Sequence, residues 1–160
     1  ANQGKYPKAR YCDEVGHAMI EKVDLVIGGT LIDSHPGHYL QVFNELTQTP
    51  EKKQIAHLVG RSGSEAELEE MAQSKQTLYI PLQFFFCRHL MQALPLIALQ
   101  YHEVKIDVKF KQLTEVVADL GTGRTSISAQ QYPITSAELL CNLVYLEEEE
   151  RKTFAGSKKG

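Results

Sequence analysis

Apolar and polar residues alternate strictly over positions 104–110, which is the most regular pattern in the chain. The apolar members are Val104, Ile106, Val108 and Phe110, and the residues between them are Lys105, Asp107 and Lys109. A helix would scatter these apolar residues around its circumference, whereas a strand places all of them on one side. The pattern therefore predicts a β-strand with one buried and one solvated face.

A second period of two covers positions 19–27. Its buried face would carry Val23, Leu25 and Ile27. Gly28-Gly29 then interrupts the pattern, and a short apolar run resumes at 30–33. Both glycines can adopt positive φ at little steric cost, as a tight turn between paired strands requires. These residues predict a β-hairpin, with a further turn at 34–37.

Two other stretches also have the character of strands. Residues 78–86 place five apolar side chains on one face: Leu78, Ile80, Leu82, Phe84 and Phe86. Pro81 cannot donate a ladder hydrogen bond, so this strand should lie at a sheet edge or at a bulge. Residues 136–146 are apolar on both faces, which predicts a central strand covered on two sides. Residues 116–120 would add one short strand.

Helical spacing is confined to short segments. Apolar residues three and four apart predict a helix over 38–46, and the charged stretch 147–154 predicts another. The polar stretch 47–76 is expected to be a long surface excursion with one helical turn, formed by Ile55, Leu58 and Val59. Residues 93–99 are either a turn of helix or an extended connection. The sum predicts an all-β fold, an antiparallel β-sandwich of the jelly-roll type with short helices in the connections.

Composition and charge narrow the function classes. The chain has 160 residues, of which 42% are apolar and 23% charged, and this suits one globular domain. A net charge of −3 argues against wrapping nucleic acid by phosphate neutralisation. No apolar run reaches the ~18–20 residues of a membrane-spanning helix. The odd number of scattered cysteines fits buried thiols in a reducing compartment: Cys12, Cys87 and Cys141.

Two groupings of histidine resemble chemical sites. His35 and His38 have a spacing that can ligate a metal, but the Pro-Gly between them predicts a turn and no neighbouring cluster completes a coordination sphere. Cys87 with His89 and His102 could form a nucleophile and its base, yet the sequence shows neither an orienting third group nor a pocket. We interpret these residues as turn residues, a small buried thiol and surface imidazoles.

Three further motifs are weaker still. Residues 121–125 (GTGRT) lack the Gly-Lys-Ser/Thr of a phosphate-binding loop. Residues 84–86 (FFF) have no interleaved basic residues, so core packing with one ring facing a neighbour is expected rather than base stacking. Residues 147–152 (EEEERK) suit a solvated helix face with ion pairs such as Glu147 with Arg151. The sequence thus predicts no catalytic, cofactor-binding or metal-binding residue, and no enzyme.

Three segments resemble the major capsid proteins of nucleocytoplasmic large DNA viruses: 27–33 (IGGTLID), 78–88 (LYIPLQFFFCR) and 93–106 (ALPLIALQYHEVKI). Residues 16–20 (GHAMI) precede the first of them as they do in that family. In that family a segment leads out of the first jelly-roll barrel, and three pairs of residues here resemble it: Tyr145-Leu146, Glu150-Arg151 and Phe154-Ala155. The chain departs from the family pattern at Phe85, where Trp is common, and at His89, where Asn is usual.

The resemblance implies a structural role without catalysis or cofactor. In that family two tandem jelly rolls form one subunit, and three subunits form a pseudo-hexagonal capsomer of an icosahedral shell. The expected partners are copies of the chain itself as a homotrimer, neighbouring capsomers and minor capsid proteins, with no direct nucleic-acid binding. The expected location is the virion capsid, assembled in the host cytoplasm. Whether an internal membrane is contacted stays open.

The resemblance also divides the chain. Residues 1–10 are expected to be an N-terminal arm or loop, 11–146 a jelly-roll domain incomplete at its N-terminal side, and 147–160 a helical exit segment with a flexible end. The chain would be the first jelly-roll portion of a longer subunit or a short paralogue. Two alternatives stay open: a minor capsid or cement protein with this fold, and a jelly-roll ligand-binding module of the sugar-binding or cupin-like type.

Overall fold

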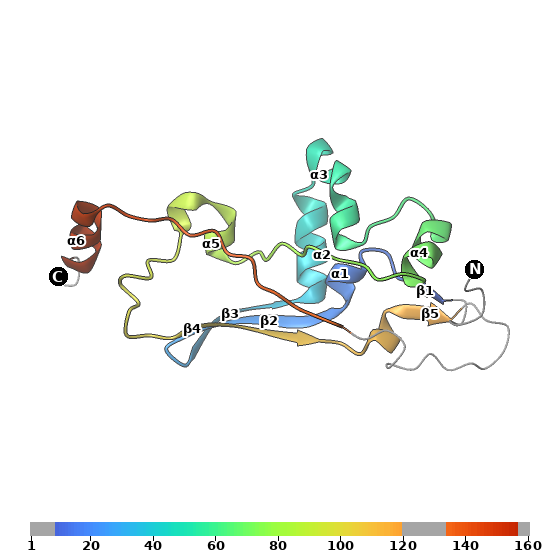
Figure 1. Ribbon diagram of the computed structural model, residues 1–160, viewed down its shortest axis with the longest axis horizontal. Helices are drawn as coiled ribbons and strands as arrows, with labels where there is room; N and C mark the ends of the chain where they lie inside the picture. The colour runs from blue at the N-terminus through green and yellow to red at the C-terminus, as the bar shows by residue number, and fades with distance from the viewer. Residues whose placement is uncertain (1–8, 120–133, 157–160) are drawn as a thin grey trace.

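The structure is a computed structural model that describes residues 9–119 and 134–156 (Figure 1). Its strands are β1 (Ala9–Tyr11), β2 (Ile20–Ile27), β3 (Thr30–Pro36), β4 (Val104–Phe110) and β5 (Val117–Asp119). Its α-helices are α1 (Val15–Ala18), α2 (Gly37–Leu46), α3 (Pro50–Gln54), α4 (Glu65–Ala72), α5 (Phe85–Arg88) and α6 (Glu148–Gly156). Its short 3₁₀ helices are η1 (Ala56–Val59), η2 (Leu90–Gln92) and η3 (Leu113–Glu115).

The central sheet has three antiparallel strands in the order β3-β2-β4. The register places Leu25 between Ile106 of β4 and Asp33 of β3, so the apolar positions of the two alternating patterns share one face. Gly28 and Gly29 have φ of 58° and 79°, the left-handed values that the predicted hairpin turn requires. The strands predicted over 19–27 and 104–110 and the hairpin between 19–27 and 30–33 are therefore confirmed.

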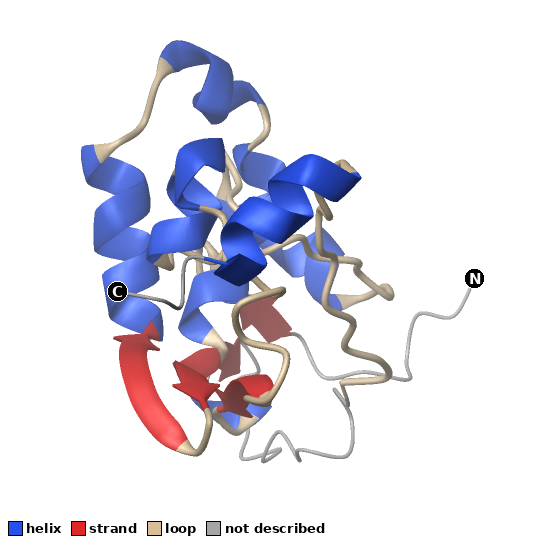
Figure 2. Ribbon diagram, turned by 90° about the vertical axis from the view of Figure 1, so that its left-hand side faces the viewer, coloured by secondary structure: helices blue, strands red, loops and turns tan. Residues whose placement is uncertain are grey.

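The inner face of this sheet is covered by helix and by irregular chain. The buried cluster on it consists of Ile20, Val23, Leu25, Leu40 and Phe84. Leu40 comes from α2 and Phe84 from the segment before α5, and Figure 2 shows helices gathered on one side of the strands. Full burial of each such side chain stabilises the fold by about 1.5–3 kcal/mol. A second cluster, formed by Ala9, Val15, Val116 and Val117, lies where β1 pairs with β5.

The fold class is confirmed in part. Both sheets are antiparallel, but more of the described residues lie in helices than in strands, so the all-β prediction does not hold as stated. Within residues 9–119 and 134–156 the cover of the central sheet comes from α2 and residues 80–86, where a sandwich would place a second sheet.

The stretch 47–76 has more structure than its polar composition indicated. It forms α3, η1 and α4, and Thr49 and Ser64 cap the two α-helices by accepting the backbone N–H three residues on. Four of its side chains are buried: Ala56, Val59, Leu68 and Ala72. The helical turn expected around Ile55, Leu58 and Val59 is present as η1. The expectation that the rest is an unstructured surface excursion was wrong, because Leu68 and Ala72 lie four residues apart and line one narrow side of α4.

Two predicted strands are not formed. Residues 78–84 are extended without a ladder, and α5 begins at Phe85. Pro81 removes a donor, and Phe84, with none of its surface exposed, packs onto the sheet face instead of joining the sheet. Residues 136–146 are likewise extended without regular structure, because no layer among the described residues covers either of their faces.

The remaining predictions fall close to the observed elements. The helices predicted over 38–46 and 147–154 are confirmed as α2 and α6, and the strand predicted over 116–120 as β5. The turn predicted at 34–37 is wrong, since β3 continues to Pro36 and α2 begins at Gly37. The connection left open at 93–99 contains turns without a regular element. The loop at 121–125 lies outside the described residues, as do residues 1–8.

Candidate functional site

His35 lies in the core of the fold. Its side chain is buried at the end of β3, and its Nε2 lies 3.1 Å from Oδ2 of Asp33. Its ring stacks on Phe84 with centroids 4.7 Å apart and contacts the ring of Tyr39 at 4.5 Å. His38 is exposed on α2. The two imidazoles considered as metal ligands therefore have different surroundings, and the described residues contain no group of three His, Cys, Asp or Glu side chains able to hold a metal.

The three phenylalanines at 84–86 extend this stack. Phe84 and Phe86 have centroids 5.7 Å apart, and Phe85 meets Phe86 edge-on at 5.3 Å. Phe84 is buried and Phe85 is 40% exposed, which matches core packing with one outward ring. Arg88 completes the attachment: it donates to the Tyr39 hydroxyl over 3.0 Å and lies 4.8 Å above the Phe43 ring. The segment is thereby fastened to β3 and α2.

Cys87, His89 and His102 show local structural contacts. The expectation of a buried thiol at Cys87 was wrong, because this residue lies on the exposed α5. Partial desolvation of the thiol still raises its pKa above the ordinary value, which disfavours the reactive thiolate. Nδ1 of His89 accepts the backbone N–H of Met91 at the start of η2, over 3.2 Å. His102 packs against the hairpin turn, where a Cβ added at Gly28 would lie 2.7 Å from its Nδ1. Neither imidazole is hydrogen-bonded to the thiol in the described part of the chain.

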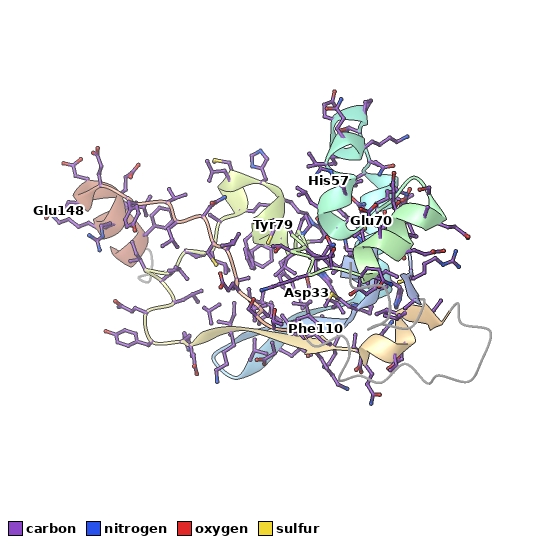
Figure 3. The ribbon with its side chains drawn as sticks, turned by 45° about the vertical axis from the view of Figure 1, so that its right-hand side comes forward. Asp33, His57, Glu70, Tyr79, Phe110 and Glu148 are labelled. Carbon is purple, nitrogen blue, oxygen red and sulfur yellow. The ribbon has the colours of Figure 1, made fainter. Side chains whose placement is uncertain are left out.

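Residues 134–146 form one exposed apolar surface. Six large side chains there are at least 40% exposed: Ile134, Leu139, Leu140, Leu143, Val144 and Tyr145. The segment is extended and leads to α6 (Figure 1). Glu148 of α6 lies far from the sheet residues Asp33 and Phe110 (Figure 3). Contiguous apolar surface of this kind marks a site of association or a layer still to be covered.

A second exposed apolar surface lies between α5 and β4. Leu90, Met91 and Leu96 are 71%, 86% and 52% exposed, on a stretch that forms η2 and a series of turns. Leu96 belongs to the segment 93–106, whose sequence resembles a capsid family, and Leu90 and Met91 lie just before that segment. Because these three side chains are exposed, they do not contribute to the core of the described fold.

One buried group was missed by the sequence reasoning. Glu14 is 1% exposed, and its carboxylate contacts Nδ1 of His17 at 3.2 Å and Nε of Arg61 at 3.3 Å. Arg61 also pairs with Glu45 of α2. Glu14 and Arg61 lie far apart in the sequence within polar surroundings. No local sequence pattern therefore predicts that their side chains form an ion pair.

Comparison with known proteins identifies the family. The model of a family described as "Major capsid protein N-terminus" matches residues 1–147. The chain belongs to this family. The match includes all three of the segments whose sequence carried the resemblance, and it ends where α6 begins.

Curated relatives come from several large viruses. A major capsid protein of Pyramimonas orientalis virus is 39% identical over 142 residues, which cover 88% of this chain and 33% of the relative. Capsid protein 1 of Acanthamoeba polyphaga mimivirus is 32% identical over 93% of this chain and 29% of its own length. A major capsid protein of Phaeocystis pouchetii virus is 32% identical over 92% of this chain. The chain thus spans about a third of the length of these relatives.

A solved structure shows the same fold. The crystal structure of PBCV-1 VP54, fitted into a reconstruction of the virophage Sputnik, superposes with a TM-score of 0.64 at 22% identity. The superposition covers 93% of this chain and 34% of VP54. The arrangement of strands and connections described above is therefore shared with about a third of VP54.

Proposed function

We propose that this chain is the first jelly-roll portion of a structural capsid subunit, and that it is not an enzyme. The observation that carries the proposal is the match of the capsid N-terminal family over residues 1–147. Relatives named as major capsid proteins in several large DNA viruses support it, as does the likeness to VP54 in fold. Three such subunits would form a pseudo-hexagonal capsomer of an icosahedral shell, located in the virion capsid and assembled in the host cytoplasm.

The bare segment 134–146 supports this reading of the chain as one part of a larger barrel. Its sequence has the two-faced apolar pattern of a central strand, yet among the described residues it pairs with no other strand. The relatives are about three times as long as the region they share with this chain. We infer that strands from that further region cover residues 136–146 on both faces. Burial of each large side chain would then contribute about 1.5–3 kcal/mol.

The partners proposed are further copies of the same subunit, neighbouring capsomers and minor capsid proteins. The exposed apolar surface between α5 and β4 supports lateral contacts, because obligate interfaces are large and apolar. The negative net charge supports the absence of direct nucleic-acid binding. No helix among the described residues has the length and apolar character needed to cross a bilayer.

The alternative of a minor capsid or cement protein shares this fold and these surfaces. The cupin-like alternative needs histidine and carboxylate ligands that converge, and the described residues offer no such group. We therefore favour the capsid subunit.

The proposal is tested on the native polypeptide that contains this sequence. Its intact mass and negative-stain images after purification are the two measurements. We expect a mass well above 18.0 kDa, the mass of this chain alone, and particles with threefold symmetry and a hexagonal outline. A monomer of 18.0 kDa without such particles would contradict the proposal.

A further inference from the structure

A buried carboxylate stands at the entrance to α1. Glu14 has a φ of 51°, in the left-handed region, and only 1% of its surface is exposed. An ionised carboxylate in such a place is costly unless it is paired and hydrogen-bonded. Its Oε2 contacts Nδ1 of His17 at 3.2 Å within α1. Its Oε1 is ion-paired with Nε of Arg61 at 3.3 Å, from the loop after η1, but forms no hydrogen bond within the described residues.

Arg61 links this carboxylate to two other parts of the fold. Its second arm pairs with Glu45 near the end of α2. The backbone on either side of it is also held: the N–H of Glu14 donates to the Gly60 carbonyl over 3.2 Å, and the N–H of Ser62 donates to Oδ1 of Asp13 over 2.9 Å. Residues 60–62, which we name the junction, are thus fixed to the start of α1 and to α2 by charge and by backbone.

Helix α4 follows directly from the junction. Leu68 and Ala72 are the buried side chains of this helix. Its other positions include four carboxylates and no basic residue: Glu65, Glu67, Glu69 and Glu70. After α4 the chain has no regular structure until α5. Helix α4 packs against β1, and because its apolar side is narrow, we expect its docking there to depend also on the position of the junction that precedes it.

We propose that the Glu14–Arg61–Glu45 cluster is a latch that keeps α4 docked and that can open without unfolding the central sheet. Loss of the Arg61 cation leaves the Glu14 carboxylate buried without its main counter-charge. The carboxylate reaches water only if the junction moves away from it, and α4 moves with the junction. The central sheet has a separate apolar cluster, to which neither Glu14 nor Arg61 belongs. Opening is therefore local to residues 60–72. This inference stands on the geometry and is independent of the proposed capsid role.

The test is hydrogen exchange of the full chain, read by mass spectrometry, for the parent and for Arg61→Met. We expect amides of α4 to lose protection by about tenfold or more, while amides of β2 and β4 change by less than about twofold. The matched control is Arg10→Met, which removes the ion pair between Arg10 and Glu65 of α4, whose carboxylate is 79% exposed. Because exposed pairs contribute little, this control should leave α4 protection nearly unchanged.

A second variant separates the latch from a general loss of stability. Glu14→Gln combined with Arg61→Met removes the buried charge together with its partner, so no carboxylate is stranded. We expect this double variant to recover much of the α4 protection that Arg61→Met loses, or to fold if Arg61→Met alone does not. The latch is overturned if α4 and the sheet lose protection equally in Arg61→Met, if neither changes, or if the double variant is no better than the single one.

Discussion

His35 of β3 lies nearly parallel to Phe84, with the two ring centroids 4.7 Å apart and the planes inclined by 22°. The contact joins an edge strand of the central sheet to a segment of irregular chain 49 positions further on. Through it the sheet acquires an apolar cover that its own strands do not provide. The residues that pack on this sheet face therefore contribute strongly to the stability of the central sheet.

Replacement of Phe84 by alanine should destabilise the chain strongly. The ring has none of its surface exposed, so its loss leaves a cavity in the cluster formed with Val23, Leu25 and Leu40. We expect a loss of about 3–5 kcal/mol in the free energy of unfolding, measured by urea denaturation. Phe85→Ala is the matched control, since that ring is 40% exposed and should cost clearly less. Equal losses for the two would show that Phe84 does not anchor the cover.

The alternation in β4 gives a paired test of its two faces. Ile106 packs against the core cluster, so Ile106→Asp places an unpaired charge against it and should unfold the chain. Lys105 is exposed and pairs with Glu103 over 3.0 Å, so Lys105→Glu should cost no more than about 1 kcal/mol. Circular dichroism during heating compares the two variants. Similar damage from both would refute the assignment of faces.

A methyl group at Gly37 should not be tolerated. The Cβ of an alanine there would lie 2.2 Å from the Ile20 carbonyl oxygen and 2.4 Å from that of His17, both of them backbone atoms. We expect Gly37→Ala to lower stability by at least about 1–3 kcal/mol in thermal denaturation. Gly63→Ala is the control, because nothing lies within 4 Å of its Cβ position. A Gly37→Ala chain as stable as Gly63→Ala would mean that α1 and α2 approach less closely than described.

The thiol of Cys12 should react with alkylating reagents only at raised pH. Burial raises the pKa of this thiol above its ordinary value, and the neighbouring Asp13 carboxylate adds to the effect. The folded chain thus binds the thiol proton more tightly than the unfolded chain does. Its contribution to stability is present below the ordinary pKa and is lost as the pH rises through the folded one.

The measurement is the rate of alkylation against pH in a chain where Cys87 and Cys141 are replaced by serine. We expect the midpoint for Cys12 to lie above that of a free cysteine, and to return to the ordinary value in denaturant. A midpoint at or below that of free cysteine in the folded chain would contradict the burial of Cys12.

Local periodicity correctly predicted those helices and strands that pack on the core with only one of their faces. The strand over 104–110, the hairpin around Gly28-Gly29 and the helix over 38–46 each repeat apolar residues at the spacing of their own geometry. In each of them the covering layer lies on one side, so the pattern and the environment agree. The resemblance to a capsid family could also be recognised from the sequence alone, because it extends over long continuous segments.

The failures have two physical causes. Residues 78–86 alternate as a strand would, but alternation requires only an extended chain against an apolar surface, and here that surface is the face of the sheet around Phe84. The meeting of Glu14 with Arg61 is a tertiary contact with no periodic signature. Residues 136–146 differ from both, since their two-sided pattern predicts cover that the described residues do not contain.

The placement of residues 136–146 in an assembled shell is the most direct test. A reconstruction by electron cryo-microscopy of the native polypeptide in its particle would resolve their backbone. We predict that they form a strand hydrogen-bonded on both sides, within a subunit repeated three times around each capsomer. A segment still extended and bare of partners, in a subunit without threefold neighbours, would contradict the capsid role proposed for this chain.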